Sequence, residues 1–273
     1  MKHKKKEYEN IKNWGMDELQ NAIWSSKYQY NNENFDEWVK RVSGGNKKIG
    51  KLIKEKKFLF AGRILANRGL PKDGINVTYS NCYVLQPPQD NIESIFDTAK
   101  YIARTFSYGG GVGIDISNLR PKGAKVHNAA KTTTGAVSFM DLYSMATGLI
   151  GQKGRRGALM ISMDVNHPDI EDFIDIKTDL DRVTKANISV RINDEFMDAV
   201  LNKTMYECKF IVNSGQEVIT KEVDAHKLFM KLITNNWDYA EPGILFWDKI
   251  ENNHLLSADK EFKYAGVNPC AEE

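Results

Sequence analysis

The side chains best suited to chemistry lie in the last nine residues of the sequence, AGVNPCAEE. Cys270 follows Asn268 by two residues and precedes Glu272 by two. Residues two apart in an extended segment point to the same side, so the carboxamide, thiol and carboxylate would face one space. Asn268 can donate and accept hydrogen bonds, and Glu272 can take a proton. The set suits chemistry on adjacent hydroxyl groups; the alternative is a solvated tail with a chance tripeptide.

The sequence has three cysteines, Cys82, Cys208 and Cys270, and no CxxC pair. An odd and sparse set indicates neither a disulfide scaffold nor a zinc site, and it fits a reducing cytoplasm. Cys82 in SNCYVL and Cys208 in YECKFIV lie in strand-like patterns, where cysteine commonly serves as a small buried hydrophobe. The histidines form no ligand-like cluster, and His167 is expected to be structural, so no metal site is predicted.

Glycines and basic residues mark three further candidate sites. In SYGGGVGID the order is helix, glycines, strand, whereas a dinucleotide fingerprint needs strand, glycines, helix, so a tight turn is predicted. Arg155 and Arg156 in GQKGRRGALM could bind a phosphate or carboxylate, or lie in a solvated loop. The long polar connection LRPKGAKVHNAAKTTTG contains Arg120 and Lys131, and connections of this length are usually functional or disordered.

The elements that must position these residues follow from hydrophobic periodicity. About the first 70 residues read as helices, with Asp17 and Asn34 as N-caps and Gly44–Gly45 as a stop. From Val77 the pattern alternates between strands and helices, which predicts parallel βαβ units. Strands are expected at 76–86, 111–117, 157–165 and 186–192, and helices at 91–110, 136–152, 167–177, 193–202 and from 224 to a turn at Pro242–Gly243.

Composition restricts the class of protein. The 273 residues are 41% hydrophobic and 27% charged, with a net charge of +2, as in an ordinary soluble globular protein. This balance gives no reason to expect direct nucleic-acid binding. The basic start MKHKKK is followed by no apolar run, so neither a secretory signal nor a membrane span is predicted.

Taken in order, the motifs SNCYVL, GGGVGIDISNLRPKGA, GRRGALM, HPDIEDFI and NPCAEE resemble the large catalytic subunit of ribonucleotide reductase. They are most similar to its adenosylcobalamin-dependent class II. The resemblance implies an α/β fold, the first half of a ten-stranded barrel over residues 76–273, preceded by a helical N-terminal region over 1–75. We therefore expect the N-terminal part of a split or truncated enzyme that ends in the active-site finger loop.

The resemblance also implies roles for single residues. Cys270 would carry the thiyl radical that abstracts the 3′ hydrogen of a ribonucleotide, and Glu272 would be the base at the 3′ hydroxyl. Asn268 would bond a substrate hydroxyl, and Cys82 would be one of two reducing thiols. The second thiol would lie beyond this sequence, since Cys208 does not match it. The substrate-binding positions are expected to be Ser80, Asn81, Gly110 and Gly111.

A nucleotide effector site is implied as well. By resemblance, Asp90 would hold the ribose of a deoxynucleoside triphosphate or ATP, and Arg120 its phosphates, with Lys131 in effector loop 1. Residues Lys177–Asn187 match loop 2, which relays effector identity to the substrate site; its expected effector-binding residues are Lys177, Arg182 and Lys185. In the family this site lies at a dimer interface, so a homodimer is expected.

The function expected from the resemblance is reduction of ribonucleotides to deoxyribonucleotides. The expected cofactor is adenosylcobalamin, the reductant is a thioredoxin-type protein, and the missing C-terminal half would be supplied in trans or after splicing. Three alternatives stay open: a class I subunit driven by a metal radical, another glycyl- or thiyl-radical barrel enzyme, and a non-catalytic nucleotide-binding regulatory protein.

Overall fold

The computed structural model describes residues 15–70, 78–150, 157–212, 217–256 and 258–272. Two compact units make up the chain, Met1–Asn81 and Cys82–Glu273. The arginine pair Arg155–Arg156, a candidate anion site, lies outside the described residues. Across the described ranges, every helix is too short or too polar to span a bilayer.

Helices form the described part of the first unit, as predicted. They are α2 (Glu18–Lys27), α3 (Phe35–Val42), α4 (Lys47–Lys54) and α5 (Gly62–Asn67). The predicted caps Asp17 and Asn34 each accept the backbone N–H three residues on, and the Gln or Glu side chain at that position bonds back to the cap. These capping boxes start α2 and α3 at fixed residues. Trp24, Phe35 and Trp38 then pack edge to face or tilted in the unit's core.

A five-stranded parallel sheet is the centre of the second unit. The strand order is β1-β2-β3-β4-β7, and every neighbouring pair is parallel. The strands are β1 (Cys82–Val84), β2 (Gly111–Asp115), β3 (Leu159–Asp164), β4 (Asn187–Ile192) and β7 (Gly243–Phe246). This arrangement agrees with the predicted half of an α/β barrel.

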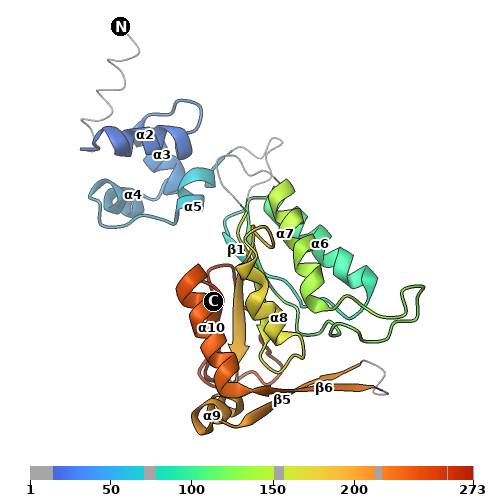
Figure 1. Cartoon of the computed structure of the whole chain (residues 1–273). Helices are drawn as coiled ribbons and strands as arrows, with labels where there is room; N and C mark the ends of the chain where they lie inside the picture. The colour runs from blue at the N-terminus through green and yellow to red at the C-terminus, as the bar shows by residue number, and fades with distance from the viewer. Residues whose placement is uncertain (1–14, 71–77, 151–156, 213–216, 257, 273) are drawn as a thin grey trace. The chain divides into compact units, whose positions relative to one another are not determined.

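Helices lie between the strands of the sheet, and one more follows the last strand. They are α6 (Ile92–Ser107), α7 (Phe139–Leu149), α8 (Ile170–Asp175), α9 (Asp194–Asn202), α10 (Ala225–Tyr239) and α11 (Trp247–Asn252), with short 3₁₀ turns η1 (Ala136–Ser138) and η2 (Ile176–Thr178). Asn91 caps α6 by accepting from Ser94 N, which leaves the preceding Asp90 available for another contact. Figure 1 shows α6 and α7 side by side.

The glycine run after α6 closes that helix. Gly109 N–H donates to Phe106 O, and Gly110 N–H to Thr105 O. This is the Schellman pattern, and Gly109 takes the left-handed conformation it requires, with φ of 82°. The order helix, glycines, strand is therefore confirmed.

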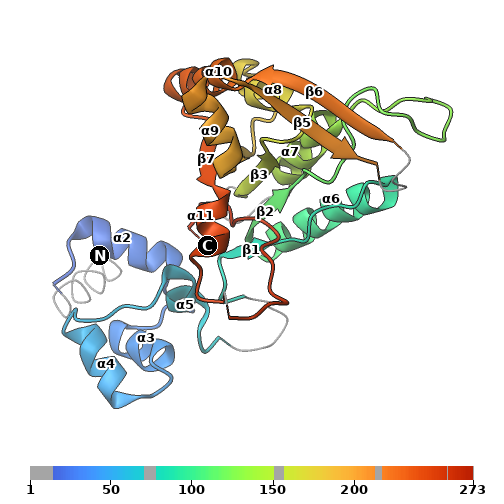
Figure 2. The same ribbon diagram turned by 90° about the horizontal axis from the view of Figure 1, so that it is seen from below.

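An antiparallel hairpin, β5 (Met205–Ile211) and β6 (Val218–Asp224), lies apart from the five-stranded sheet (Figure 2). The sequence YECKFIV predicts its first strand, but no pattern predicts the second. Most side chains of β6, VITKEVD, are exposed in the structure. Its sequence lacks the alternating apolar pattern that indicates a strand.

The two faces of the parallel sheet differ in chemistry. One face is apolar and joins the main hydrophobic core through Val112, Ile114, Leu159, Ile161, Met163, Ile188, Val190 and Ile192. The opposite face, by the twofold alternation of a strand, holds mainly small or polar residues: Cys82, Gly111, Gly113, Asp115, Ser162, Ser189 and Arg191. We call this second face the polar face.

Candidate active site

The C-terminal loop, residues 264–272, lies against the polar face at two glycines of β2. A Cβ atom built on Gly113 would lie 1.7 Å from the carbonyl oxygen of Val267, and one on Gly111 would lie 2.8 Å from Pro269 Cγ. Real Cβ atoms do not approach other atoms so closely, so only glycine lets the loop backbone reach the sheet. The glycine run thus has a purpose beyond the predicted turn, because it forms the groove that holds the loop.

A tight turn, rather than an extended segment, carries Cys270. Ala271 N–H donates to Asn268 O over 3.0 Å, with Pro269 in the second position of the turn, where its fixed φ is favoured. Ala271 has φ of 63°, in the left-handed region. The expectation that Asn268, Cys270 and Glu272 share one side of an extended segment is therefore wrong. Asn268 is 0% exposed, whereas Cys270 and Glu272 reach the surface.

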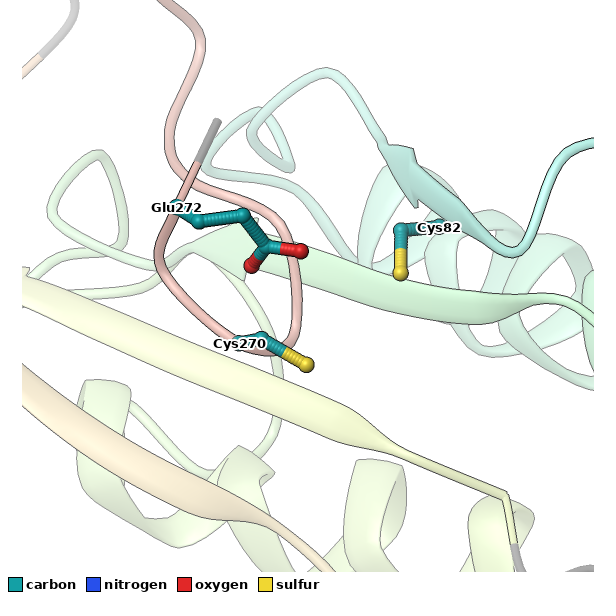
Figure 3. A group of neighbouring side chains, drawn as sticks. All are labelled: Cys82, Cys270 and Glu272. Atoms are coloured by element: carbon teal, nitrogen blue, oxygen red, sulfur yellow. The ribbon is translucent and has the colours of Figure 1, made fainter. Parts of the chain in front are cut away.

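The turn nevertheless brings the principal candidates together. The Sγ atoms of Cys82 and Cys270 and a carboxylate oxygen of Glu272 all lie within 4.8 Å of one another. Figure 3 shows the three side chains directed into one space, Cys82 from β1 and the other two from the loop. Two thiols and a carboxylate at this spacing can exchange protons and hydrogen atoms with one bound molecule.

Cys208 lies elsewhere, as expected. It is fully buried in β5, and its Sγ contacts Val165 O. Burial raises the pKa of its thiol to about 12, so it stays protonated and unreactive at neutral pH. His167 is structural too, because its Nδ1 accepts from Asp169 N and its Nε2 donates to Leu119 O, which fixes the neutral imidazole. Burial lowers the pKa of this imidazole.

The remaining predicted substrate positions fall in different places. Ser80 and Asn81 end the first unit, where Ser80 N–H donates to Thr78 Oγ1 and Asn81 Oδ1 accepts from Arg63 Nε. Gly110 packs closely on Tyr83, because a Cβ atom built on this glycine would lie 2.6 Å from the tyrosine ring. Close packing against Tyr83 therefore explains why position 110 is a glycine. The substrate contacts of all these positions remain predictions.

Sequence reasoning missed a polar cluster at the carboxyl ends of the strands. Asp115 on β2 accepts from Ser162 Oγ over 2.7 Å and pairs with Arg191 Nη1 over 3.0 Å. The Arg191 guanidinium lies over the ring of Trp247, 3.8 Å from its centroid, and Arg191 Nη2 lies 3.7 Å from Asp164. Burial raises the pKa of Asp164. The only signal in the sequence was a single charged residue in each of three otherwise uncharged strands, β2, β3 and β4.

Comparison with known proteins identifies the barrel. A family model described as "Ribonucleotide reductase, barrel domain" matches residues 80–273. The chain belongs to the ribonucleotide reductase family. It is 36% identical over 71% of its length to the Vitamin B12-dependent ribonucleoside-diphosphate reductase of Thermoplasma acidophilum, covering 25% of that protein. It is 30% identical over 94% of its length to the protein of the same description from Mycobacterium tuberculosis, covering 35%.

A third relative in the ribonucleotide reductase family is the Vitamin B12-dependent ribonucleotide reductase of Streptomyces avermitilis. It is 34% identical over 79% of this chain, and the chain covers 24% of its length. The chain thus spans about a quarter to a third of the length of these relatives. Among the relatives is also the Ribonucleoside-diphosphate reductase subunit alpha of Helicobacter pylori, 29% identical over 62% of this chain.

The predicted effector residues Asp90 and Arg120 of this ribonucleotide reductase domain are joined directly. Arg120 Nε pairs with Asp90 Oδ2 over 2.7 Å, and Arg120 N–H donates to Asp90 Oδ1. Both line a cavity of about 360 Å³ between the start of α6 and the connection 126–134, a volume in the range of small-molecule sites. Lys131 is exposed at the tip of that connection, with φ of 62°, and does not line the cavity.

The predicted loop 2 residues have separate surroundings. Lys177 Nζ donates to Val183 O and Ala186 O and pairs with Glu241, so its charge holds the loop together. Arg182 pairs with Asp141 and lines a second cavity of about 410 Å³. Lys185 N–H donates to Ser144 Oγ. These contacts show how loop 2 is held; its effector contacts remain a prediction.

Proposed function

We propose that the chain provides the radical-bearing and first reducing thiol of a ribonucleotide reductase, which converts ribonucleotides to 2′-deoxyribonucleotides. The observation that carries the proposal is the meeting of Cys82, Cys270 and Glu272 within 4.8 Å on the polar face. Side chains separated by nearly the whole second unit converge here, and the glycine groove of β2 is shaped for the loop that brings two of them.

Each of the three groups suits one part of the reaction. Cys270, as a thiyl radical, would take the hydrogen atom from the 3′ carbon, and Glu272 would take the proton of the 3′ hydroxyl. Cys82 would give a hydrogen atom to the 2′ carbon after the 2′ oxygen leaves as water. The two electrons of the reduction come from Cys82 and a second thiol, which pair as a disulfide. The buried, protonated Cys208 is unsuited to be that second thiol.

Asn268 is the group proposed to bond a substrate hydroxyl. Its side chain is fully buried beneath the turn, so this role requires the turn to move when substrate binds. The left-handed Ala271 supplies a strained position at which such movement can occur. We therefore propose that the turn 268–271 opens to present the carboxamide.

Adenosylcobalamin is the proposed cofactor, because relatives at 30–36% identity are described as B12-dependent. Adenosylcobalamin would need an accessible thiol at this site, and among the described residues Cys270 provides one. The cofactor would supply the radical that removes the hydrogen atom from that thiol. Gly111 and Gly113 would position the loop that carries this thiol, through their close approach to Pro269 and Val267.

The Asp90–Arg120 cavity is proposed to bind the nucleotide effector, a deoxynucleoside triphosphate or ATP. A guanidinium suits the phosphates and a carboxylate suits ribose hydroxyls. A homodimer, a thioredoxin-type reductant and a cytoplasmic location belong to the same proposal. All three cysteines are thiols, which suits a reducing compartment.

The test measures deoxyribonucleotide formation from a ribonucleotide by this chain, alone and mixed with a polypeptide carrying the remainder of a relative's barrel. Adenosylcobalamin and a dithiol reductant are added in both cases. We expect turnover only in the mixture, and its loss in Cys82→Ser and Cys270→Ser but not in Cys208→Ser. Turnover that survives Cys270→Ser would reject the proposal, whereas turnover by the chain alone would show that the thiols present here suffice.

A further inference from the structure

We propose that Arg191 is a positioning residue for the C-terminal loop, acting through the ring of Trp247 to set the spacing between Cys270 and Cys82. Arg191 lies on the polar face of the sheet, where its guanidinium pairs with Asp115 and stacks on the ring of Trp247. This inference adds a residue to the site proposed above and rests on that site's geometry.

The first step is the anchoring of the guanidinium. Arg191 Nη1 pairs with Asp115 over 3.0 Å, and that carboxylate also accepts from Ser162 Oγ and Ser117 N–H. Asp115 is 2% exposed and Arg191 16% exposed. The pair therefore links β4 to β2 across β3 in a place where solvent screens it little, and its donors and acceptors fix the direction of the guanidinium plane.

The second step is the contact with Trp247. The guanidinium carbon lies 3.8 Å from the centroid of the indole ring, which is the geometry of a desolvated cation–π contact. Trp247 Nε1 donates to Glu251 Oε1 over 2.8 Å. The ring is thus fixed at its face by Arg191 and at its edge by Glu251.

The third step is the contact between the ring and the loop. Trp247 forms a small apolar cluster with Met160, Leu245 and Val267, and Tyr264 packs edge to face with it at 6.1 Å between centroids. Val267 lies three residues before Cys270, and its carbonyl rests on Gly113. The loop therefore touches the Trp247 ring through Tyr264, and Val267 belongs to the same apolar cluster while its carbonyl rests on Gly113, so a displaced ring would let the base of the loop move.

The test uses the thiols themselves and needs neither cofactor nor turnover. In a glutathione buffer, two protein thiols and one glutathione disulfide give the Cys82–Cys270 disulfide and two glutathione thiols. The ratio of disulfide to dithiol form, from non-reducing peptide mapping, gives the effective concentration of one thiol at the other. Cys208 serves as the internal unreactive thiol, since it is buried.

We expect Arg191→Met to lower this effective concentration by about tenfold or more, because sub-ångström to ångström displacements have effects of that size on reacting groups. Arg191→Lys keeps a charge for Asp115 but loses the planar stack, and we expect a decrease of about threefold. The matched control is Lys221→Met, which breaks the exposed pair with Glu171 and should leave the value unchanged.

Thermal unfolding is measured on every variant. Should Arg191→Met not fold, the folded Arg191→Lys decides the matter. Wild-type effective concentration in the folded Arg191 variants would overturn the proposal, and so would a wild-type chain that forms no Cys82–Cys270 disulfide. A chain that passes this test but reduces no ribonucleotide would reject the proposed function and leave the positioning role of Arg191 standing.

Discussion

Replacing Gly113 by alanine should displace the C-terminal loop while leaving the sheet intact. The new Cβ would lie 1.7 Å from the Val267 carbonyl oxygen, and contacts below 3.0 Å do not occur. The loop must therefore move by at least about 1.3 Å, the difference between those distances. The sheet can hardly yield instead, because Val112 and Ile114 fix β2 in the main core on the other face.

The energetic cost follows from what the loop buries. Val267 is 4% exposed, and exposing a side chain of this size costs about 1.5–3 kcal/mol. Overpacking a well-filled site costs a similar ~1–3 kcal/mol. Because the loop can relieve the clash by lifting, which exposes Val267, the exposure cost and the overpacking cost describe the same loss of stability and are not added. We expect the free energy of unfolding to fall by about 1–3 kcal/mol.

Two measurements check this prediction. Urea unfolding followed by circular dichroism gives the stability, and the glutathione assay gives the effective concentration of Cys270 at Cys82, which should fall by about 10² for a displacement near 1 Å. The control is Gly148→Ala in α7, where a Cβ would meet only side-chain atoms of Lys185, at 3.4 Å or more. It should unfold at or slightly above wild-type stability, because alanine favours helix by about 0.5–1 kcal/mol. A Gly113→Ala chain with wild-type stability and wild-type thiol pairing would show that the loop does not depend on a glycine at this position.

Three other predictions concern separate parts of the molecule. A thiol reagent at neutral pH should label two cysteines in the folded chain, and Cys208 only after unfolding, since burial raises its thiol pKa to about 12; mass spectrometry after labelling shows this, and rapid labelling of native Cys208 would contradict it. Asp90→Ala should reduce the thermal protection given by a deoxynucleoside triphosphate, whereas Asp97→Ala, exposed on the helix α6 that follows Asp90, should not; equal protection in both would argue against the cavity. Burial lowers the pKa of His167 below its unfolded value near 6.5, so its contribution to stability is present above that pH and lost as pH falls below it. The unfolding free energy should therefore drop less between pH 7 and pH 5 in His167→Gln than in wild type, and an equal drop would show that His167 is not the group responsible.

Local signals allow much of the fold to be predicted from sequence. Asp17 and Asn34 act within one helical turn, and the glycines after α6 close that helix through neighbouring carbonyls, so their roles depend only on nearby residues. The alternation of strands and helices likewise predicts the parallel sheet. The strand β6 escapes prediction because its exposed side chains break the expected pattern.

The site is predictable in part. The motifs name Cys82, Cys270 and Glu272, and the structure brings them together. The burial of Asn268 does not follow from the sequence, because an extended segment and a turn at Pro269 are both compatible with the same residues. The partnership of Asp115 with Arg191 depends on strand order and register, neither of which a single sequence displays.

The contact between Gly113 and Val267 also bears on the order of folding. The two residues are separated by most of the second unit, and contacts of such sequence separation form late because a long loop must close first. The helices and the strands up to β7 can form without the C-terminal loop, since their core lies on the opposite face. We therefore expect the thiols to meet only in the last step, after the sheet is complete. A nascent or partly unfolded chain would keep Cys82 and Cys270 apart, and so would be unable to form either the reactive centre or a disulfide between them before the scaffold is ready.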